Sequence, residues 1–250
     1  MVYPEEDPEH FVRTFAPILH FHPKEGNYCC FPSDAEAVFE RHSKDWSGFG
    51  KTLQPKKLQQ DTPCYYEIWD GPDMTQMKFW FWYNYNKFPK APLGLGQHIG
   101  DWEHIEVRHY PLGSKTPGTI WLVSNHLKAI LGSHPGHFIL QGFMPQPVTL
   151  ADLHIHVWVA LGSHASYLSP DDKTRRFLGF WRDETEDGGP IWETEENLKG
   201  LGDTNFGRFE GRWGNKRSPR SPRNPYNCRE RNAPLLKPTP VNENQNGLSS

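Results

Sequence analysis

The sequence has no long apolar run, and this limits the kind of protein that it encodes. No segment reaches the roughly 18 consecutive apolar residues that a membrane-spanning helix needs. The first ten residues are acidic and lack the basic and apolar regions of a secretory signal. A net charge of −3 provides no overall basic field for nucleic acid. We therefore expect a soluble protein with no transmembrane segment and no nucleic-acid partner, for which peripheral membrane contact stays open.

Cysteine is scarce, and its spacing does not suggest a metal motif. The four cysteines are Cys29, Cys30, Cys64 and Cys228, and no two of them have the spacing of a zinc-binding pair. Adjacent cysteines also seldom bridge each other. The pattern predicts reduced thiols in a cytoplasmic protein. A mature secreted form whose signal has been removed stays the alternative.

Aromatic residues and turn formers are abundant, in contrast. The chain has 10 Trp, 15 Phe, 9 Tyr, 22 Gly and 23 Pro in 250 residues, with a mean hydropathy of −0.75. Bulky aromatics between frequent turns predict a mainly β fold with long loops and a few short helices. Ser33 and Glu36 form a capping box that predicts one such helix. We expect a single domain over residues 1–231 and a disordered tail over 232–250, which contains almost nothing to bury.

Two strands are predicted most strongly, and they lie close together in the chain. Residues 78–86 alternate aromatic side chains with others, and the stretch 94–109 begins as a glycine-rich loop and ends as an alternating strand. Their proximity favours antiparallel pairing. Asp101 and Glu103 then share one face of the second strand, and that face continues as apolar residues. Carboxylates at the head of an apolar face need a counter-charge.

The spacing of His98, Asp101 and Glu103 predicts a site for a divalent cation at this point. Carboxylate oxygens suit Mg²⁺, Ca²⁺ or Mn²⁺, and the imidazole shifts the preference toward Mn²⁺ or Zn²⁺. The alternative is an ordinary hydrogen-bond cluster, in which the three side chains pair with Arg, Lys or backbone groups. Spacing alone does not decide between the two.

Three further side chains are candidates for the same site. His164 lies at a glycine-broken strand end, where it could serve as another ligand or as a general base. Asn84 and Asn86 end the aromatic strand and are candidates to line the site through their amide groups. A histidine that is hydrogen-bonded in a turn is the simpler interpretation of His164 considered alone.

Other histidines occur in pairs on predicted strands. His20 and His22 share one face of an extended segment, and His154 and His156 share a face with Trp158. Packing explains these pairs as well as function does, so the sequence assigns them no role.

The chain contains four blocks, at residues 16–25 with 31–34, 100–106, 159–167 and 209–214, that together resemble a known family. This family is called vacuolar protein sorting-associated protein 62 and is found mainly in fungi and plants. The matching blocks are Ala16-Pro-Ile-Leu-His-Phe-His-Pro-Lys-Glu with Phe31-Pro-Ser-Asp, Gly100-Asp-Trp-Glu-His-Ile-Glu, Val159-Ala-Leu-Gly-Ser-His-Ala-Ser-Tyr and Phe209-Glu-Gly-Arg-Trp-Gly. The resemblance implies a role in protein delivery to the vacuole and association with that compartment. It implies no particular chemistry.

The segment 94–107 is also similar to the Gly-His-Arg-His-Asp-Trp-Glu motif of necrosis- and ethylene-inducing proteins, which are secreted cytolysins. That resemblance implies a β-sandwich fold and a divalent cation held by His98, Asp101 and Glu103. Two departures are evident, since one extra residue separates the glycines from Asp101 and the family's additional aspartate has no clear counterpart. We carry over the sandwich and the cation site, but not the cytolytic activity.

These observations together predict an intracellular β-sandwich with a cation site at its rim. Its function is expected to be recognition of a glycan, a lipid headgroup or another small-molecule or protein ligand, with vacuolar sorting as the context. A metal-dependent hydrolase, lyase or cyclase is the first alternative, with Asp101, Glu103 or His164 as general acid or base. A membrane-active protein similar to the cytolysins is the second. A shallow rim would favour recognition, and an enclosed cavity would favour catalysis.

Overall fold

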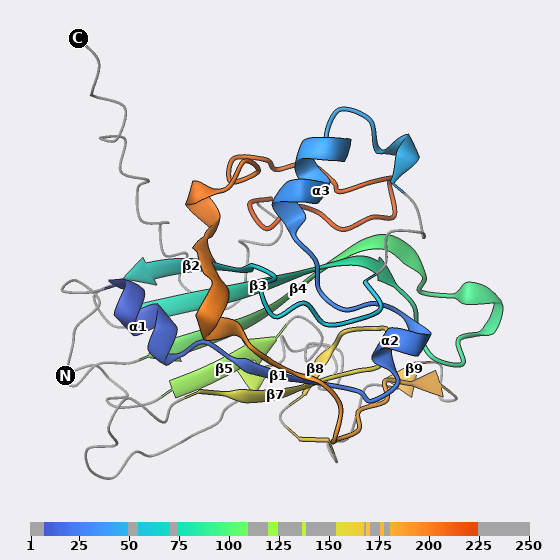
Figure 1. Cartoon of the computed structure of the whole chain (residues 1–250), viewed down its shortest axis with the longest axis horizontal. Coiled ribbons are helices and arrows are strands. Elements are labelled where there is room, and N and C mark those ends of the chain that lie inside the picture. The colour runs from blue at the N-terminus through green and yellow to red at the C-terminus, as the bar shows by residue number, and fades with distance from the viewer. Residues whose placement is uncertain are drawn as a thin grey trace.

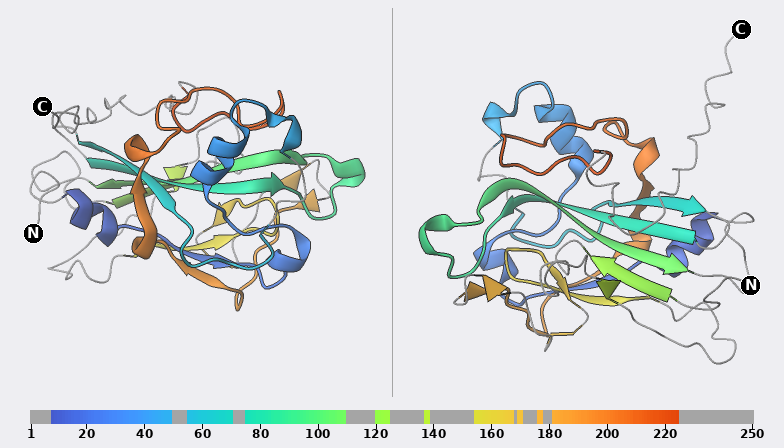
Figure 2. Two further views of the ribbon diagram at one scale, coloured as in Figure 1. Left: turned by 45° about the horizontal axis from the view of Figure 1, so that its top comes forward. Right: turned by 180° about the vertical axis from the view of Figure 1, so that it is seen from behind.

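The fold is a β-sandwich with a third, irregular layer above it (Figure 1). The computed structural model of the chain describes residues 8–49, 55–70, 75–109, 120–124, 137–138, 154–167, 169–170, 176–177 and 181–224. The strands of the larger sheet cross the middle of the molecule in Figure 1, and those of the smaller sheet lie below them. Helix α3 and the segment after residue 200 cover the upper side, as the view from behind in Figure 2 also shows.

The larger sheet has the strand order β12-β2-β3-β4-β5-β6 within the described residues. Its strands are β2 (Cys64–Asp70), β3 (Thr75–Asn86), β4 (His98–His109), β5 (Ile120–Ser124), β6 (His137–Phe138) and β12 (Leu198–Gly200). Neighbours pair antiparallel except β12 and β2, which run parallel. The long hairpin of β3 and β4 places Tyr83 opposite Asp101 and Phe81 opposite Glu103.

The smaller sheet has the order β11-β1-β7-β8 and joins distant parts of the chain. Its strands are β1 (Ile18–Phe21), β7 (His156–Val159), β8 (Ser166–Tyr167) and β11 (Ile191–Glu193). Strand β1 pairs parallel with β7 and antiparallel with β11. Strands β9 (Arg176–Phe177) and β10 (Trp181–Arg182) form a separate two-stranded ribbon.

The helices are short, as the composition predicts. They are α1 (Pro8–Thr14), α2 (Glu25–Tyr28), α3 (Ala35–His42) and the 3₁₀ turns η1 (Trp46–Gly48), η3 (Pro92–Gly94), η6 (Thr194–Asn197) and η7 (Leu201–Asp203). The predicted capping box is wrong in detail, because Asp34 rather than Ser33 caps α3. The Asp34 Oδ1 atom accepts from the backbone N–H of Glu36 and also from the hydroxyl of Tyr65, a tertiary contact that no local pattern reveals. Among the described residues no helix is long and apolar enough to cross a bilayer.

Apolar side chains of alternate residues fill the space between the two sheets. On β3 and β4 the odd-numbered positions point into this space, so Asp101 and Glu103 share it with Ile105 and Val107 as predicted. The apolar side chains of this core come from both sheets and include Leu19, Phe21, Phe79, Phe81, Val157, Val159 and Trp192. Apolar faces from two sheets buried against each other define a sandwich, and the predicted fold class is confirmed.

The even-numbered positions of the same strands build a second core under the third layer. It is almost entirely aromatic, and it contains Tyr65, Trp80, Trp82, Trp102, Phe206 and Trp213. The rings of Trp82 and Trp213 lie 4.7 Å apart, and Trp102 and Trp213 meet edge to face at 5.1 Å. Aromatic pairs at these separations are favourable beyond the area that they bury. This packing attaches the segment after residue 200 to the sheet.

A buried ion network lies on this second face, and we name it the outer cluster. It consists of Glu67, Lys78, Glu106 and Arg223. Glu67, Lys78 and Glu106 occur on β2, β3 and β4 in direct register, so their charges alternate across three strands. The Lys78 Nζ atom is 3.5 Å from Glu106 Oε2, and Arg223 Nε is 3.2 Å from Glu67 Oε1. The protein supplies the cations for these carboxylates itself.

The predicted domain boundary is not tested by these observations. Residues 225–250, which include the predicted tail over 232–250 and Cys228, lie outside the described part of the chain. The strands predicted at residues 78–86 and at the end of the stretch 94–109 are present as β3 and β4, and they pair antiparallel as expected.

Candidate functional site

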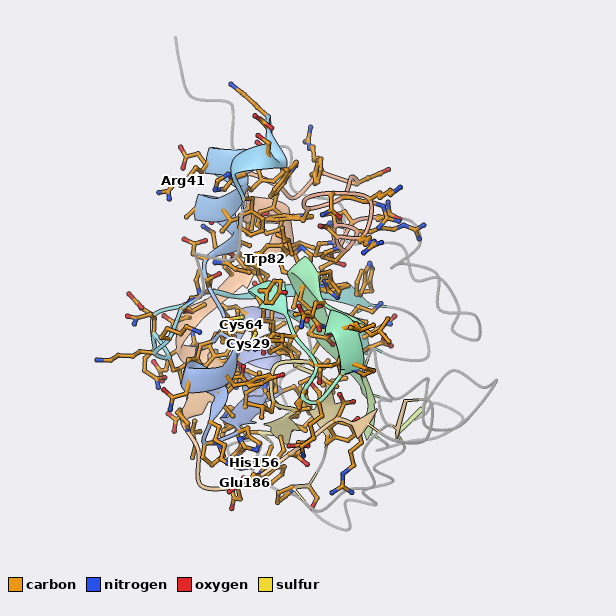
Figure 3. All side chains as sticks on the ribbon, turned by 90° about the vertical axis from the view of Figure 1, so that its right-hand side faces the viewer. Cys29, Arg41, Cys64, Trp82, His156 and Glu186 are labelled. Carbon is orange, nitrogen blue, oxygen red and sulfur yellow. The ribbon has the colours of Figure 1, made fainter. Side chains whose placement is uncertain are left out.

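Five buried polar side chains converge between the two sheets, and we name them the inner cluster. They are Glu25, Cys29, Cys30, Asp101 and His164. Their exposed fractions range from 0% to 4%. They come from helix α2, strand β4 and the turn between β7 and β8, which are far apart in the sequence. Figure 3 shows Cys29 in the middle layer of the molecule, below Trp82.

His164 is at the centre of the inner cluster and uses both ring nitrogens. Its Nδ1 atom lies 3.0 Å from Asp101 Oδ2, and its Nε2 atom faces Glu25 Oε1 at 3.7 Å and Cys30 Sγ at 4.0 Å. The ring stacks on Tyr83 with a centroid distance of 3.7 Å and an interplanar angle of 3°. Packing and a hydrogen bond therefore fix the ring so that Nε2 points at the thiols.

The backbone around His164 adopts an unusual conformation that the local sequence allows. His164 has a φ of +56° and Gly162 a φ of +64°, both in the left-handed region. A side chain at residue 162 would collide with the backbone oxygen of Lys87, since a Cβ there would lie 2.3 Å from it. Non-glycine residues in this region cost on the order of 1 kcal/mol and concentrate at functional sites. The glycine permits the turn, and the turn directs His164 inward.

Helix α2 brings the acid and the two thiols to the same point. Glu25 accepts hydrogen bonds from the backbone N–H groups of Cys30 at 3.2 Å and Gly162 at 2.9 Å, so its carboxylate links α2 to the turn. The Sγ atoms of Cys29 and Cys30 are 3.2 Å apart. Both thiols also lie within hydrogen-bond distance of the backbone oxygen of Tyr85. Neighbouring residues thus present two sulfur atoms to one imidazole.

The contacts shift the pKa values within the inner cluster in opposite directions. The hydrogen bond from Cys30 lowers the pKa of Cys29 to about 6, against the effect of burial and with help from His164. The same hydrogen bond, together with burial, raises the pKa of Cys30. Burial alone would lower the pKa of His164, but hydrogen bonding to Asp101, the thiols and Glu25 raises it. These shifts favour a thiolate at Cys29 and a protonated imidazole at His164 at neutral pH.

The donor atoms have the spacing of ligands around one metal ion. In the described part of the chain, Cys29, Cys30 and His164 are the group whose ligand atoms all lie within 4.8 Å of one another. Tetrahedral zinc sites, with bonds of about 2.3 Å to sulfur and about 2.0 Å to nitrogen, place their donors about 3.3–3.8 Å apart. The 3.2 Å between the two Sγ atoms and the 4.0 Å between His164 Nε2 and Cys30 Sγ lie on either side of this range, and these three side chains form the donor group.

The surroundings of His164 resemble the support that metal-ligating histidines receive. Such histidines usually donate their second ring N–H to a carboxylate, which fixes the tautomer and the orientation of the ring. Asp101 has this position, and Asn86 in turn donates from Nδ2 to Asp101 Oδ2 at 3.1 Å. His164 and Asn86, two of the side chains considered for the site of Asp101, thus both contact the Asp101 carboxylate.

The other predicted site residues lie elsewhere around the same hairpin. His98 is half-buried, and its Nδ1 atom contacts the backbone oxygen of Gly100 at 2.6 Å. Glu103 is buried on the inner face, two residues after Asp101. Burial is the main reason that the pKa of Tyr83 is raised, and the nearby Glu103 carboxylate raises it further. Asn84 points to the other face, where Oδ1 accepts from Ser33 and from the indole of Trp82.

A surface groove lies beside α2 but does not reach the inner cluster. Its volume is about 440 Å³, and its lining includes Gly26, Asn27, Phe31, Lys56 and Lys57. None of the five residues of the inner cluster lines it. Access from solvent to the thiols and the imidazole therefore requires local opening of the fold.

Sequence reasoning missed Cys29, Cys30 and Glu25 as site residues. The cysteines were considered for ligand spacing along the chain, where adjacent residues do not fit a zinc motif. Their partner His164 is 134 residues away from Cys30. The sequence around Cys29 and Cys30 offers no local signal of this site, because helix α2 separates the two cysteines from the segment that contains His20 and His22.

Comparisons with known proteins give no family and a weak structural likeness. No protein-family model matches the chain, and no curated protein matches it. Among solved structures it is similar to the non-toxic HaNLP3 protein, with 16% identity, a TM-score of 0.40 and coverage of 82% of this chain and 83% of the other. It is also similar to Necrosis and Ethylene inducing Protein 2 from the causal agent of cocoa's Witches Broom disease, with 13% identity, a TM-score of 0.37 and coverage of 76% and 72%.

A third structure in this group was solved with an amino sugar. NLPPya in complex with glucosamine has 11% identity to this chain, a TM-score of 0.35 and coverage of 80% of this chain and 81% of the other. Identities and TM-scores this low assign neither a family nor an activity to the present protein. The resemblance to the vacuolar sorting family gains no support from these comparisons.

Proposed function

We propose that this protein binds a divalent transition-metal ion of the zinc class through Cys29, Cys30 and His164. The observation that carries the proposal is the convergence of two thiols and an imidazole nitrogen within 4.8 Å of one another. Thiolate and imidazole donors favour Zn²⁺ over Mg²⁺ and Ca²⁺, which prefer oxygen. The thiols must be reduced to bind, and the predicted cytoplasmic location would keep them so.

The role of this ion would be structural. All three ligands have 0% exposed surface, so the ion would be enclosed by the protein rather than open to a substrate. The ion would join α2 to the turn between β7 and β8, next to Asp101 on β4. It would thereby hold the two sheets together at the end where the polar residues lie.

The hard-cation site at His98, Asp101 and Glu103 stays a separate prediction. Asp101 would be a ligand in that site, whereas in the thiol site it orients His164. Metal binding at the hard-cation site would therefore depend on His98, whereas metal binding at the thiol site would depend on Cys30. Recognition of a glycan, a lipid headgroup or a protein in the context of vacuolar sorting likewise stays a prediction, for which the described contacts provide no test.

The enzyme hypothesis has one specific observation in its favour. Cys29, His164 and Asp101 are arranged as thiol, imidazole and carboxylate, and the pKa of Cys29 is lowered to about 6. Such an order activates a cysteine nucleophile in some hydrolases. The complete burial of both Cys29 and His164 leaves no room for a substrate, and this favours the metal site. Hydrolysis of an activated ester that disappears in Cys29→Ser would reverse this preference.

A metal titration of the reduced, metal-free protein tests the proposal. With Co²⁺ we expect the ultraviolet charge-transfer band of a thiolate ligand, and with Zn²⁺ at about 100 times its dissociation constant a stabilisation of about 2.7 kcal/mol, read from thermal unfolding. Both signals should be absent in Cys30→Ser. Both signals should be retained in Cys64→Ala. Cys64 is as buried as Cys30, but its thiol is hydrogen-bonded to Thr194 and does not belong to the inner cluster.

A His98→Gln variant separates the two metal assignments. It should leave the Co²⁺ band and the Zn²⁺ stabilisation unchanged if the thiol site is correct. Stabilisation by Mg²⁺, Ca²⁺ or Mn²⁺ that is lost in His98→Gln but kept in Cys30→Ser would instead establish the hard-cation site and reject the thiol site as the metal centre. A wild-type protein that is stabilised by none of these ions contradicts both assignments.

A further inference from the structure

A second group of histidines lies on the outer face of the smaller sheet, away from the inner cluster. Figure 3 shows His156 at the bottom of the molecule, below the layer that contains Cys29. The parallel pairing of β1 with β7 places His20 beside Trp158, its partner in register. The Nε2 atom of His20 lies 2.7 Å from the Nδ1 atom of His156. His156 is exposed and His20 is half-buried, so solvent reaches this pair.

Neighbouring side chains hold the two rings in place. The ring of Trp158 stacks on that of His20 with a centroid distance of 4.6 Å and an interplanar angle of 13°. The indole N–H of Trp158 donates to Asp187 Oδ1 at 3.2 Å. The His20 ring is therefore oriented by an aromatic neighbour that is itself fixed by a carboxylate.

We propose that His20 and His156 form a solvent-accessible binding site for a divalent transition-metal ion such as Ni²⁺, Cu²⁺ or Zn²⁺. Two imidazole nitrogens bound to one ion at about 2.0–2.1 Å lie about 2.9–3.4 Å apart. The observed 2.7 Å separation needs only a small rotation of the exposed His156 ring to reach this range.

Two histidines that flank these strands, His22 after β1 and His154 before β7, are not available in this way. His154 occupies the same face of the chain two residues before His156, but its Nδ1 atom contacts the Ala16 oxygen at 2.9 Å and its Nε2 atom faces Glu195 at 3.2 Å. His22 is buried and has contacts at both nitrogens, with the Lys24 N–H and with Glu186. The pair of His20 and His156 thus differs from its neighbours in directing two nitrogens toward each other at the surface.

The chemistry of this surface site would differ from that of the inner cluster. Two imidazoles leave several coordination positions to water, so the ion would exchange readily and could accept a carboxylate or phosphate oxygen from a bound molecule. Imidazole ligands without thiolate suit Ni²⁺ and Cu²⁺. This inference uses none of the residues of the inner cluster and stands independently of the proposed function.

The test uses the full chain without an affinity tag, with Cys30→Ser introduced to silence the inner cluster. Calorimetric titration with Ni²⁺ should show saturable binding of one ion, and the Cu²⁺ complex should show nitrogen splitting in its electron paramagnetic resonance spectrum. Adding His156→Gln, or separately His20→Gln, should abolish both signals. Adding His154→Gln, the matched control on the same face, should leave them intact.

Three results would overturn the inference. These are the absence of saturable Ni²⁺ binding, binding that is unchanged by both His20→Gln and His156→Gln, and binding that is lost equally in His154→Gln. Failure here is distinguishable from failure of the thiol site, because the thiolate band with Co²⁺ reports only on the inner cluster. Thermal unfolding without metal would confirm that each surface variant is folded.

Discussion

The inner and outer clusters lie on opposite faces of the larger sheet, and both contain buried carboxylates. In the outer cluster Glu67 and Glu106 meet the cations Lys78 and Arg223, which the chain itself provides. In the inner cluster Asp101 and Glu25 flank an imidazole that also faces two thiols. Fixed cations make a self-contained ion network, whereas imidazole and thiolate are ligands. Both clusters are buried, so burial does not distinguish them. The side chains that face the carboxylates do: Lys and Arg in the outer cluster, and an imidazole with two thiols in the inner cluster.

The largest effect should come from breaking the outer cluster. Lys78→Met should destabilise the protein by about 3–5 kcal/mol, because removing one partner leaves buried charges without compensation. Urea unfolding measures this loss. The double variant of Lys78→Met with Glu106→Leu should recover part of it, since apolar replacement of both partners of a buried pair is often tolerated. A single variant within experimental error of wild type would show that the network contributes no stability.

A smaller effect is expected from the protonation of Glu67. Burial raises the pKa of Glu67 to about 7 from 4.5, although Arg223 and Lys78 lower it in part. The folded protein therefore holds this proton more tightly than the unfolded chain does, and the free energy of unfolding falls as the pH rises from 4.5 through about 7. Glu67→Gln should remove this decrease, which is on the order of 3 kcal/mol.

Measuring unfolding free energies across that pH window checks the sign as well as the size of this effect. The wild type should lose stability relative to Glu67→Gln as the pH increases. Parallel profiles for the two proteins would mean that Glu67 ionises in the folded state much as it does in the unfolded chain. Arg223 and Lys78 would then offset the whole effect of burial on the pKa of Glu67.

The smallest effect is expected from a change at Asp101, which tests the inner cluster through its affinity for Zn²⁺. Asp101→Asn should weaken Zn²⁺ binding by about 10–100-fold, the usual result of losing the carboxylate that orients a ligating histidine. Glu103→Gln, two residues along on the same face, should change the affinity little. Competition with a chromogenic chelator measures both. Equal losses in the two variants would favour the site predicted from His98, Asp101 and Glu103 instead.

The sequence predicted the hairpin of β3 and β4 and the face on which Asp101 and Glu103 lie, because alternation is a local property of a strand. It also identified His164 from a glycine before a histidine at a strand end. It could not predict that this histidine contacts Asp101, since the contact depends on how the two sheets pack. Cys29 and Cys30 were missed for the same reason, because their ligand geometry is completed from the turn after β7 rather than from the residues beside them.

The parallel pairing of β1 with β7 also has a consequence for the order in which the protein is made. Strand β1 emerges early from the ribosome, yet its partners β7 and β11 begin at His156 and Ile191. The smaller sheet therefore cannot form until most of the chain has been synthesised, as expected for pairings between distant residues. Until then the thiols of Cys29 and Cys30 lack His164, the imidazole that faces them in the folded protein.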